Sequence, residues 1–67
     1  MTHDEIYLYL KKILPIYKNE EYVKIWKPIR KNSILLITKD DESFVFTMYD
    51  YKRFVYETLE SFIAKDI

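Results

Sequence analysis

The amino-acid sequence predicts an α+β domain: a helix, a three-stranded antiparallel β-meander and a second helix (αβββα), with both helices on one face of the sheet. Apolar residues recur at helical spacing near both ends of the chain, whereas β-branched and aromatic residues concentrate in its middle. The 67 residues contain no internal repeat, linker or low-complexity tract. We therefore expect one domain spanning residues 1–67.

A first helix is predicted from about residue 3 to residue 14. Thr2 and Glu5 form a T-x-x-E capping box, in which each side chain satisfies a main-chain amide of the first turn. Pro15 disfavours helical geometry at the preceding residue and has no amide to donate, so the helix should end there. The residues at helical spacing that should form its buried stripe are Ile6, Tyr9, Leu10, Ile13 and Leu14.

The segment after this helix favours a strand. Residues 22–26, YVKIW, are rich in residues that prefer extended structure, and Pro28 ends this strand or marks it as a sheet edge. A short helix over residues 16–26 is the competing interpretation, because several residues of this segment also tolerate a helix.

Two further strands are predicted at residues 34–38 and 44–49, around the acidic turn KDDES. Asn32 and Ser33 suit the turn before them. Because both runs are apolar at consecutive positions, they predict a sheet that needs cover on both faces.

The last element is predicted to be a helix over residues 51–63, with Asp50 as its N-cap. Its apolar and threonine residues follow the spacing i, i+3, i+4, i+7, i+8, i+11 and i+12 that is typical of a core-facing helix. These residues are Tyr51, Phe54, Val55, Thr58, Leu59, Phe62 and Ile63.

Two helices, each about 10 Å wide, cover one face of a three-stranded sheet about 14 Å wide. With a two-residue turn within residues 39–43, the covered face would hold Val23, Ile25, Leu35, Ile37, Phe44, Phe46 and Met48. The opposite face would then be bare in the monomer. It would carry Tyr22, Lys24, Trp26, Ile34, Leu36, Thr38, Val45, Thr47 and Tyr49. The alternative is that one helix crosses to this face and makes it a second core layer.

The composition favours an intracellular protein. Cysteine is absent, which excludes a disulfide framework, and no apolar stretch approaches the roughly 20 residues that span a bilayer. The start MTHDEIY is acidic where a signal peptide is basic, so we expect a cytoplasmic protein, in the host cytoplasm if it is viral. The absence of the thermolabile residues glutamine and cysteine is what a protein from a hot environment would show. The abundance of Lys, Ile and Tyr is also typical of AT-rich coding in small viral or phage genes.

No pattern in the sequence indicates catalysis. The single histidine, His3, lies in the first turn of the capped helix, and the serines have no recognisable triad partner. Without glycine the chain contains no phosphate-binding loop or dinucleotide fingerprint, so we expect no cofactor. The acidic run at Asp40 lacks the spacing of a calcium loop and is typical of a solvated hairpin tip. We therefore expect a protein that is not an enzyme and holds no metal.

The first functional hypothesis is a protein-interaction module, such as a small regulatory or inhibitor protein. The bare sheet face would dock on a second copy, giving a homodimer, or on another protein, with large aromatic residues as anchors. The residues predicted at this interface are Tyr22, Trp26, Ile34, Leu36, Val45 and Tyr49.

The second hypothesis is nucleic-acid binding. Basic residues surround an aromatic residue at the end of the first strand, and more basic residues begin the last element, a combination that suits phosphates and bases. The candidate residues are Lys24, Trp26, Lys27, Arg30, Lys31, Lys52 and Arg53. The predicted element order is similar to that of double-stranded RNA-binding domains. However, KPIRKN and DYKRF stand where that family has its hairpin signature and its lysine-rich helix start, so the resemblance is limited to topology.

Overall fold

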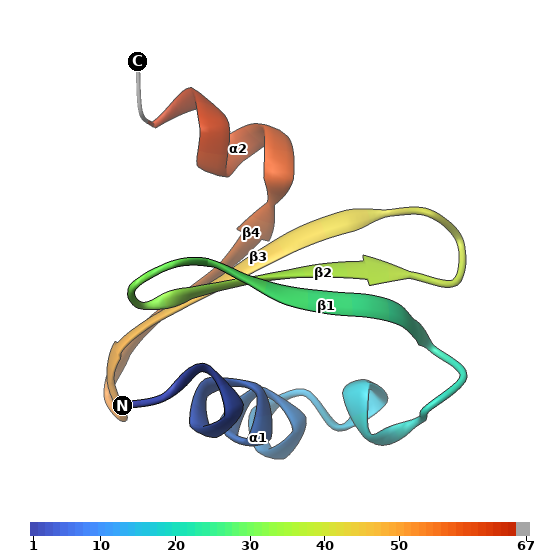
Figure 1. Ribbon diagram of the computed structural model, residues 1–67, viewed down its shortest axis with the longest axis horizontal. Helices are drawn as coiled ribbons and strands as arrows, with labels where there is room; N and C mark the ends of the chain where they lie inside the picture. The colour runs from blue at the N-terminus through green and yellow to red at the C-terminus, as the bar shows by residue number, and fades with distance from the viewer. Residues whose placement is uncertain (66–67) are drawn as a thin grey trace.

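A four-stranded antiparallel sheet with the simple meander order β1-β2-β3-β4 forms the centre of the molecule. The computed structural model describes residues 1–65. Along the chain the elements are α1 (His3–Ile13), the 3₁₀ helix η1 (Pro15–Lys18), β1 (Val23–Arg30), β2 (Ser33–Thr38), β3 (Ser43–Asp50), β4 (Arg53–Thr58) and α2 (Leu59–Ala64). In Figure 1, α1 lies on one side of the sheet and α2 on the other. The α+β class is confirmed, whereas the three-stranded sheet and the placement of both helices on one face are wrong.

The capped first helix is confirmed. The Thr2 hydroxyl accepts the Glu5 amide at 3.1 Å, and the Glu5 carboxylate accepts the Thr2 amide at 2.9 Å. The helix stops before Pro15, which opens η1 because proline is well suited to a first helical position. The strand prediction for residues 22–26 is also confirmed, because β1 begins at Val23 and forms an edge of the sheet.

The predicted helix over residues 51–63 is wrong. Its first half forms β4, and the chain becomes helical only at Leu59, where the Thr58 hydroxyl accepts the Ser61 amide at 3.1 Å as the true N-cap. Asp50 instead closes the β3–β4 turn, where its carboxylate accepts the Arg53 amide at 2.9 Å. Aromatic and β-branched side chains favour extended structure, and pairing with β3 supplies the hydrogen bonds that decide between the two states.

The predicted strand register is wrong by one residue. The β2–β3 loop contains Lys39, Asp40 and Asp41, and the Thr38 amide donates to the Glu42 carbonyl across it at 2.9 Å. Asp41 adopts a left-handed conformation with φ 62°, which an aspartate tolerates and which a three-residue loop requires. A loop longer by one residue than expected moves every β2 side chain to the other face relative to β3.

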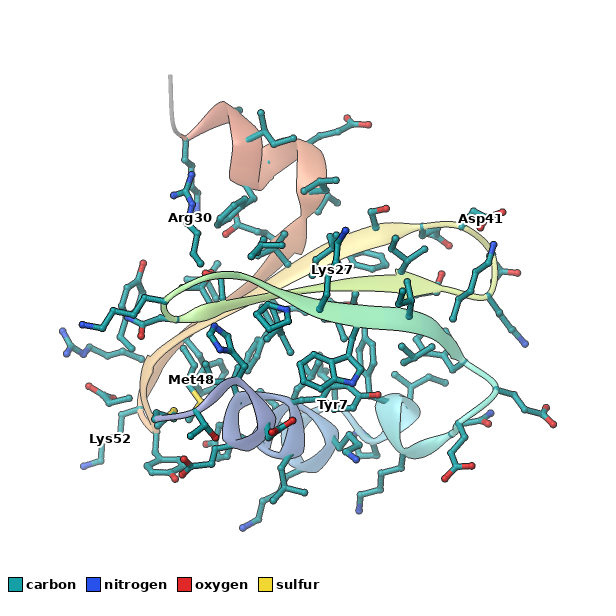
Figure 2. The ribbon with its side chains drawn as sticks, viewed as in Figure 1. Tyr7, Lys27, Arg30, Asp41, Met48 and Lys52 are labelled. Atoms are coloured by element: carbon teal, nitrogen blue, oxygen red, sulfur yellow. The ribbon has the colours of Figure 1, made fainter. Side chains whose placement is uncertain are left out.

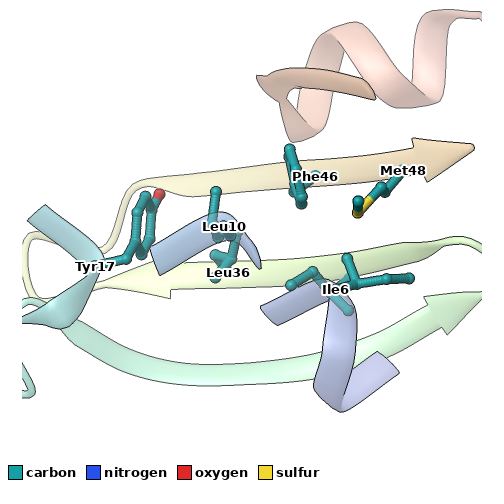
Figure 3. Close-up of a cluster of buried hydrophobic side chains, with 7 residues drawn as sticks. Ile6, Leu10, Tyr17, Leu36, Phe46 and Met48 are labelled. Atoms are coloured by element: carbon teal, nitrogen blue, oxygen red, sulfur yellow. The ribbon is translucent and has the colours of Figure 1, made fainter. Parts of the chain in front are cut away.

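The main core lies between α1 and the sheet. Figure 3 shows α1 and η1 side chains meeting residues of β2 and β3 there. Pairing of Ile34 with Phe46, and of Leu36 with Phe44, puts alternate residues of both strands on this face. The buried cluster consists of Ile6, Leu10, Tyr17, Ile34, Leu36, Phe46 and Met48.

The second face has its own cover from α2, which contacts β3 and β4. Val45 is fully buried there, and the hydroxyls of Ser33 and Thr47 bond to each other at 2.7 Å. The Arg30 guanidinium stacks over the Phe62 ring at 4.7 Å, which ties α2 to β1. This face is therefore a second, smaller core layer. The alternative interpretation of the sequence, in which one helix crosses to this face, is confirmed.

Candidate protein-interaction surface

The six residues predicted as a sheet-face interface do not share a face. Ile34 and Leu36 are completely buried beneath α1, and Val45 is completely buried on the α2 side. Tyr49 is largely exposed, at 59%. The register error and the crossing of α2 to the second face explain this outcome, so the predicted docking face is not a surface of this molecule.

The two aromatic anchors predicted on β1 and before it are packed within the monomer. Trp26 stacks on Tyr7 with ring centroids 4.6 Å apart, and Tyr22 meets Tyr17 edge-on at 5.3 Å. Both Trp26 and Tyr22 pack against the main core. One ring face of Trp26 is thus occupied by Tyr7 of α1.

The structure divides the residues predicted to bind nucleic acid between the two ends of the sheet. Lys24 is held at the far end of β1 by Asp41, with Nζ and the carboxylate 2.9 Å apart. Lys27 and Tyr7 lie on opposite sides of the sheet, as Figure 2 shows. The turns that carry Lys31 and Lys52 lie at one end of the sheet.

The two arginines of the predicted nucleic-acid set have structural contacts. Arg30 stacks on Phe62, as described above, and its carbonyl accepts a hydrogen bond from Nε2 of His3 at 2.6 Å. Arg53 pairs with Asp50 at 2.7 Å, and this contact is the leading cause that holds the pKa of the Asp50 carboxyl below its usual value. These residues therefore stabilise turns and element packing.

A groove of about 590 Å³ runs along the outer side of α1, between η1 and the β3–β4 turn. Its apolar wall is built by Leu8, Tyr9 and Tyr51, and the Tyr9 hydroxyl donates to the Tyr51 carbonyl at 3.0 Å. Leu8 is 65% exposed and Tyr51 is 58% exposed. We call this feature the α1 groove; its lining residues are Glu5, Leu8, Tyr9, Lys11, Lys12, Lys18 and Tyr51.

The charge of the α1 groove is positive. Three lysines line it, against one carboxylate, that of Glu5. The capping bonds with Thr2 engage this carboxylate and keep its pKa below the usual value, the main-chain bond contributing most. Lys11 also lies over the Tyr7 ring, with Nζ 4.7 Å from its centroid. The groove therefore combines exposed apolar carbon with an excess of cations.

Further aromatic side chains extend along β4 on the α1 side of the sheet. Phe54 and Tyr56 remain 39% and 37% exposed. Phe54 meets the edge of Tyr9 at 5.8 Å, and the Tyr56 hydroxyl lies 2.5 Å from that of Tyr17. Burial is the leading cause that raises the pKa of Tyr17 well above its usual value, and the bond to Tyr56 adds to it.

Sequence reasoning missed the α1 groove. Leu8 lies outside the buried stripe of the first helix, and an apolar residue on the outer side of an amphipathic helix is a signal that could have identified it. Tyr51 was assigned to the core of a helix that does not form. Proximity of Tyr51 to α1 depends on the β3–β4 turn, which local periodicity does not reveal.

Within residues 1–65, no helix is long and apolar enough to cross a membrane, and no three His, Cys, Asp or Glu side chains gather as metal ligands. The functional assignment rests on geometry, because no family model, curated protein or solved structure matches this chain.

Proposed function

We propose that this chain is a non-enzymatic protein-interaction module, which holds an acidic segment of another protein in the α1 groove. The observation that carries the proposal is the exposure of Leu8 and Tyr51 within a groove lined by lysines. An apolar contact ringed by charge is the arrangement by which many protein surfaces bind a partner.

The chemistry of the groove favours a protein segment over a nucleic acid. Leu8 offers an aliphatic surface, which suits an apolar side chain and has no donor or acceptor for a base or a phosphate. Lys12 and Lys18 would attract carboxylates of the same segment and align it along α1. The partner segment is therefore acidic and carries at least one large apolar side chain.

The placement of His3 supports a binding role over a catalytic one. Its Nε2 donates to the Arg30 carbonyl, so the single histidine of the chain joins α1 to β1. A module of this kind acts by occupying its partner's surface, as a regulatory or inhibitory protein does.

A titration followed by amide NMR tests the proposal. The probe is an amphipathic helical peptide whose polar positions are glutamate and whose apolar positions are leucine. We expect shifts at Leu8, Tyr9 and Tyr51, and affinity that falls as salt is added. Two matched probes are the same peptide with lysine in place of glutamate, and a single-stranded oligonucleotide of equal length.

Variants locate the binding site. Leu8→Glu should weaken binding of the acidic peptide about tenfold or more, and Lys12→Glu should weaken it about two- to fivefold. Lys39→Glu, at an exposed position in the β2–β3 loop, is the matched control and should change affinity little. Equal binding of the lysine peptide, tighter binding of the oligonucleotide, or shifts confined to other surfaces would each contradict the proposed function.

A further inference from the structure

The outer strand β4 carries main-chain groups that point away from the sheet. The Met48 amide donates to the Asn32 carbonyl at 2.9 Å, so this stretch of β3 directs the Met48 groups toward β2. Because the direction alternates along a strand, the groups of Thr47 point toward β4, where its partner in register is Val55. The amides and carbonyls of Phe54 and Tyr56, on either side of Val55, therefore point outward.

This strand lacks several of the features that usually prevent edge-to-edge pairing. From Phe54 to Thr58 it pairs with β3 without a register shift, and it contains neither proline nor lysine. Half-exposed Phe54 and Tyr56 stand on its α1 side. An uninterrupted edge with exposed aromatics is a template for strand addition.

The sequence of β4 is complementary to itself in antiparallel alignment. Reading outward from Val55, the flanking residues are aromatic on both sides, Phe54 and Tyr56, and then oppositely charged, Arg53 and Glu57. A two-fold axis through Val55 would pair each aromatic residue with the other aromatic of the second copy. It would also set Arg53 directly opposite Glu57 of the second copy.

We propose that the chain forms a two-fold homodimer in which β4 pairs antiparallel with β4 of a second copy, with Val55 at the axis. Each Phe54–Tyr56 pair then exchanges both main-chain hydrogen bonds, because the outward groups belong to these residues. The sheet continues across the axis with both copies of α1 on one face. This dimer is built on main-chain groups of β4 and on none of the residues that line the α1 groove, so it does not rest on the proposed function.

Glu57 and Arg53 each already make an ion pair within one chain. The Glu57 side chain is only 10% exposed, and Oε1 lies 2.9 Å from Nζ of Lys65, within ion-pair distance but without hydrogen-bond geometry. The Arg53 side chain is 75% exposed, and its contact with Asp50 uses Nε. The remaining guanidinium donors suit a carboxylate on the second copy. Both residues are thus paired within one chain and have capacity for a further partner.

Cysteine cross-linking gives a direct test, since the chain has no cysteine of its own. Val55 would face Val55 of the second copy at a non-hydrogen-bonded position, where Cα atoms are about 4.5 Å apart and a disulfide can close. We expect Val55→Cys to oxidise rapidly to a covalent dimer of twice 8.3 kDa. Ile25→Cys, on the opposite edge of the sheet and 52% exposed, is the matched control and should cross-link far more slowly.

A charge swap tests register without requiring a disulfide. Arg53→Glu and Glu57→Arg would each place like charges opposite each other in their own dimers, and each protein should sediment as a monomer. Mixing the two should restore a dimer, since each new charge then meets its opposite. If unmixed Glu57→Arg fails to fold, Glu57→Gln with Arg53→Gln should still weaken association at least severalfold.

Several results would overturn the homodimer. One is sedimentation of the unmodified chain at 8.3 kDa at millimolar concentration, and another is cross-linking of both cysteine variants at equal rates. Larger open assemblies would indicate pairing of β4 with β1 instead of with itself. Lys12→Glu should leave the dimer intact, so loss of groove binding and loss of dimerisation are separate outcomes.

Discussion

The two edges of the sheet differ in how they are protected. Strand β1 contains Pro28, which has no amide to donate, and its pairing with β2 shifts register at both of its ends. Lys24 and Lys27 are exposed along it. Strand β4 pairs regularly from Phe54 to Thr58, with one register shift next to the β3–β4 turn, and exposes the rings of Phe54 and Tyr56 instead.

This difference shows that the same sheet handles its edges in two ways. Proline, irregular register and lysine are the usual means by which an edge strand avoids pairing with another chain. Their concentration on β1 makes the regular, aromatic β4 a distinct feature of the molecule. The comparison supports self-pairing on one side only, which would close at a dimer and leave no fibre-forming edge.

The largest expected effect comes from a substitution in the main core, between α1 and the sheet. Phe46→Ala removes a completely buried ring between α1 and β3 and should cost about 3–5 kcal/mol of unfolding free energy. Ile25→Ala, at an exposed position on β1, should cost far less. Urea denaturation followed by tryptophan fluorescence measures both. Equal effects would show that the core does not lie on the α1 side.

The next prediction concerns a lysine introduced on β4, of the kind that β1 already carries along its edge. Phe54→Lys places a charge on the free edge and should weaken self-association about tenfold or more. Its unfolding free energy, measured on the monomer at low concentration, should fall less than that of Phe46→Ala, because Phe54 is already 39% exposed. Sedimentation equilibrium measures the association, and unchanged dimerisation would argue against β4 as the contact.

Tyr17→Phe removes the hydrogen bond that joins η1 to β4 and so tests how much this contact stabilises the β4 edge. Losing the hydroxyl bond to Tyr56 should cost about 1 kcal/mol, measured by thermal unfolding. The two tyrosines also give a pH dependence. Burial raises both pKa values above the usual 10.0, so the unfolded chain releases these protons first and stability falls as pH rises above about 10. The decline should be shallower in Tyr17→Phe, and an identical decline would contradict this assignment.

The smallest effect concerns the protected edge. Lys24→Ala removes an exposed ion pair with Asp41, so the loss of unfolding free energy should be below about 0.5 kcal/mol. Because other protective features remain on β1, self-association should not increase. Formation of larger assemblies by this variant would show that Lys24 alone prevents β1 from pairing with another chain.

Elements specified by local chemistry were predictable from the sequence. The first helix follows from the Thr2–Glu5 capping box and from Pro15, and both boundaries are confirmed within a residue. The β1 edge follows from Pro28, which excludes a central strand position. In these cases a single residue type imposes its geometry irrespective of distant contacts.

Features that depend on distant partners were not predictable. Residues 53–58 satisfy helical spacing, yet they also alternate between faces as a strand, and only the unpaired side of β3 decides between them. The strand register depends on Asp41, whose left-handed backbone lengthens the loop where glycine would have signalled it. The predicted interface failed for the same reason, since Leu36 and Val45 lie on opposite faces once the register is corrected.

The direct passage from β4 into α2 at Thr58 has a mechanical consequence. With no loop between them, a displacement of the outermost strand would be transmitted directly to the helix that covers the second face. Detaching β4 from β3 would lift α2 away and bring Val45 into contact with water. Detachment of β4 from the sheet is therefore coupled to solvent exposure of the core layer beneath α2. A partner that holds β4 in place would also keep that core layer buried.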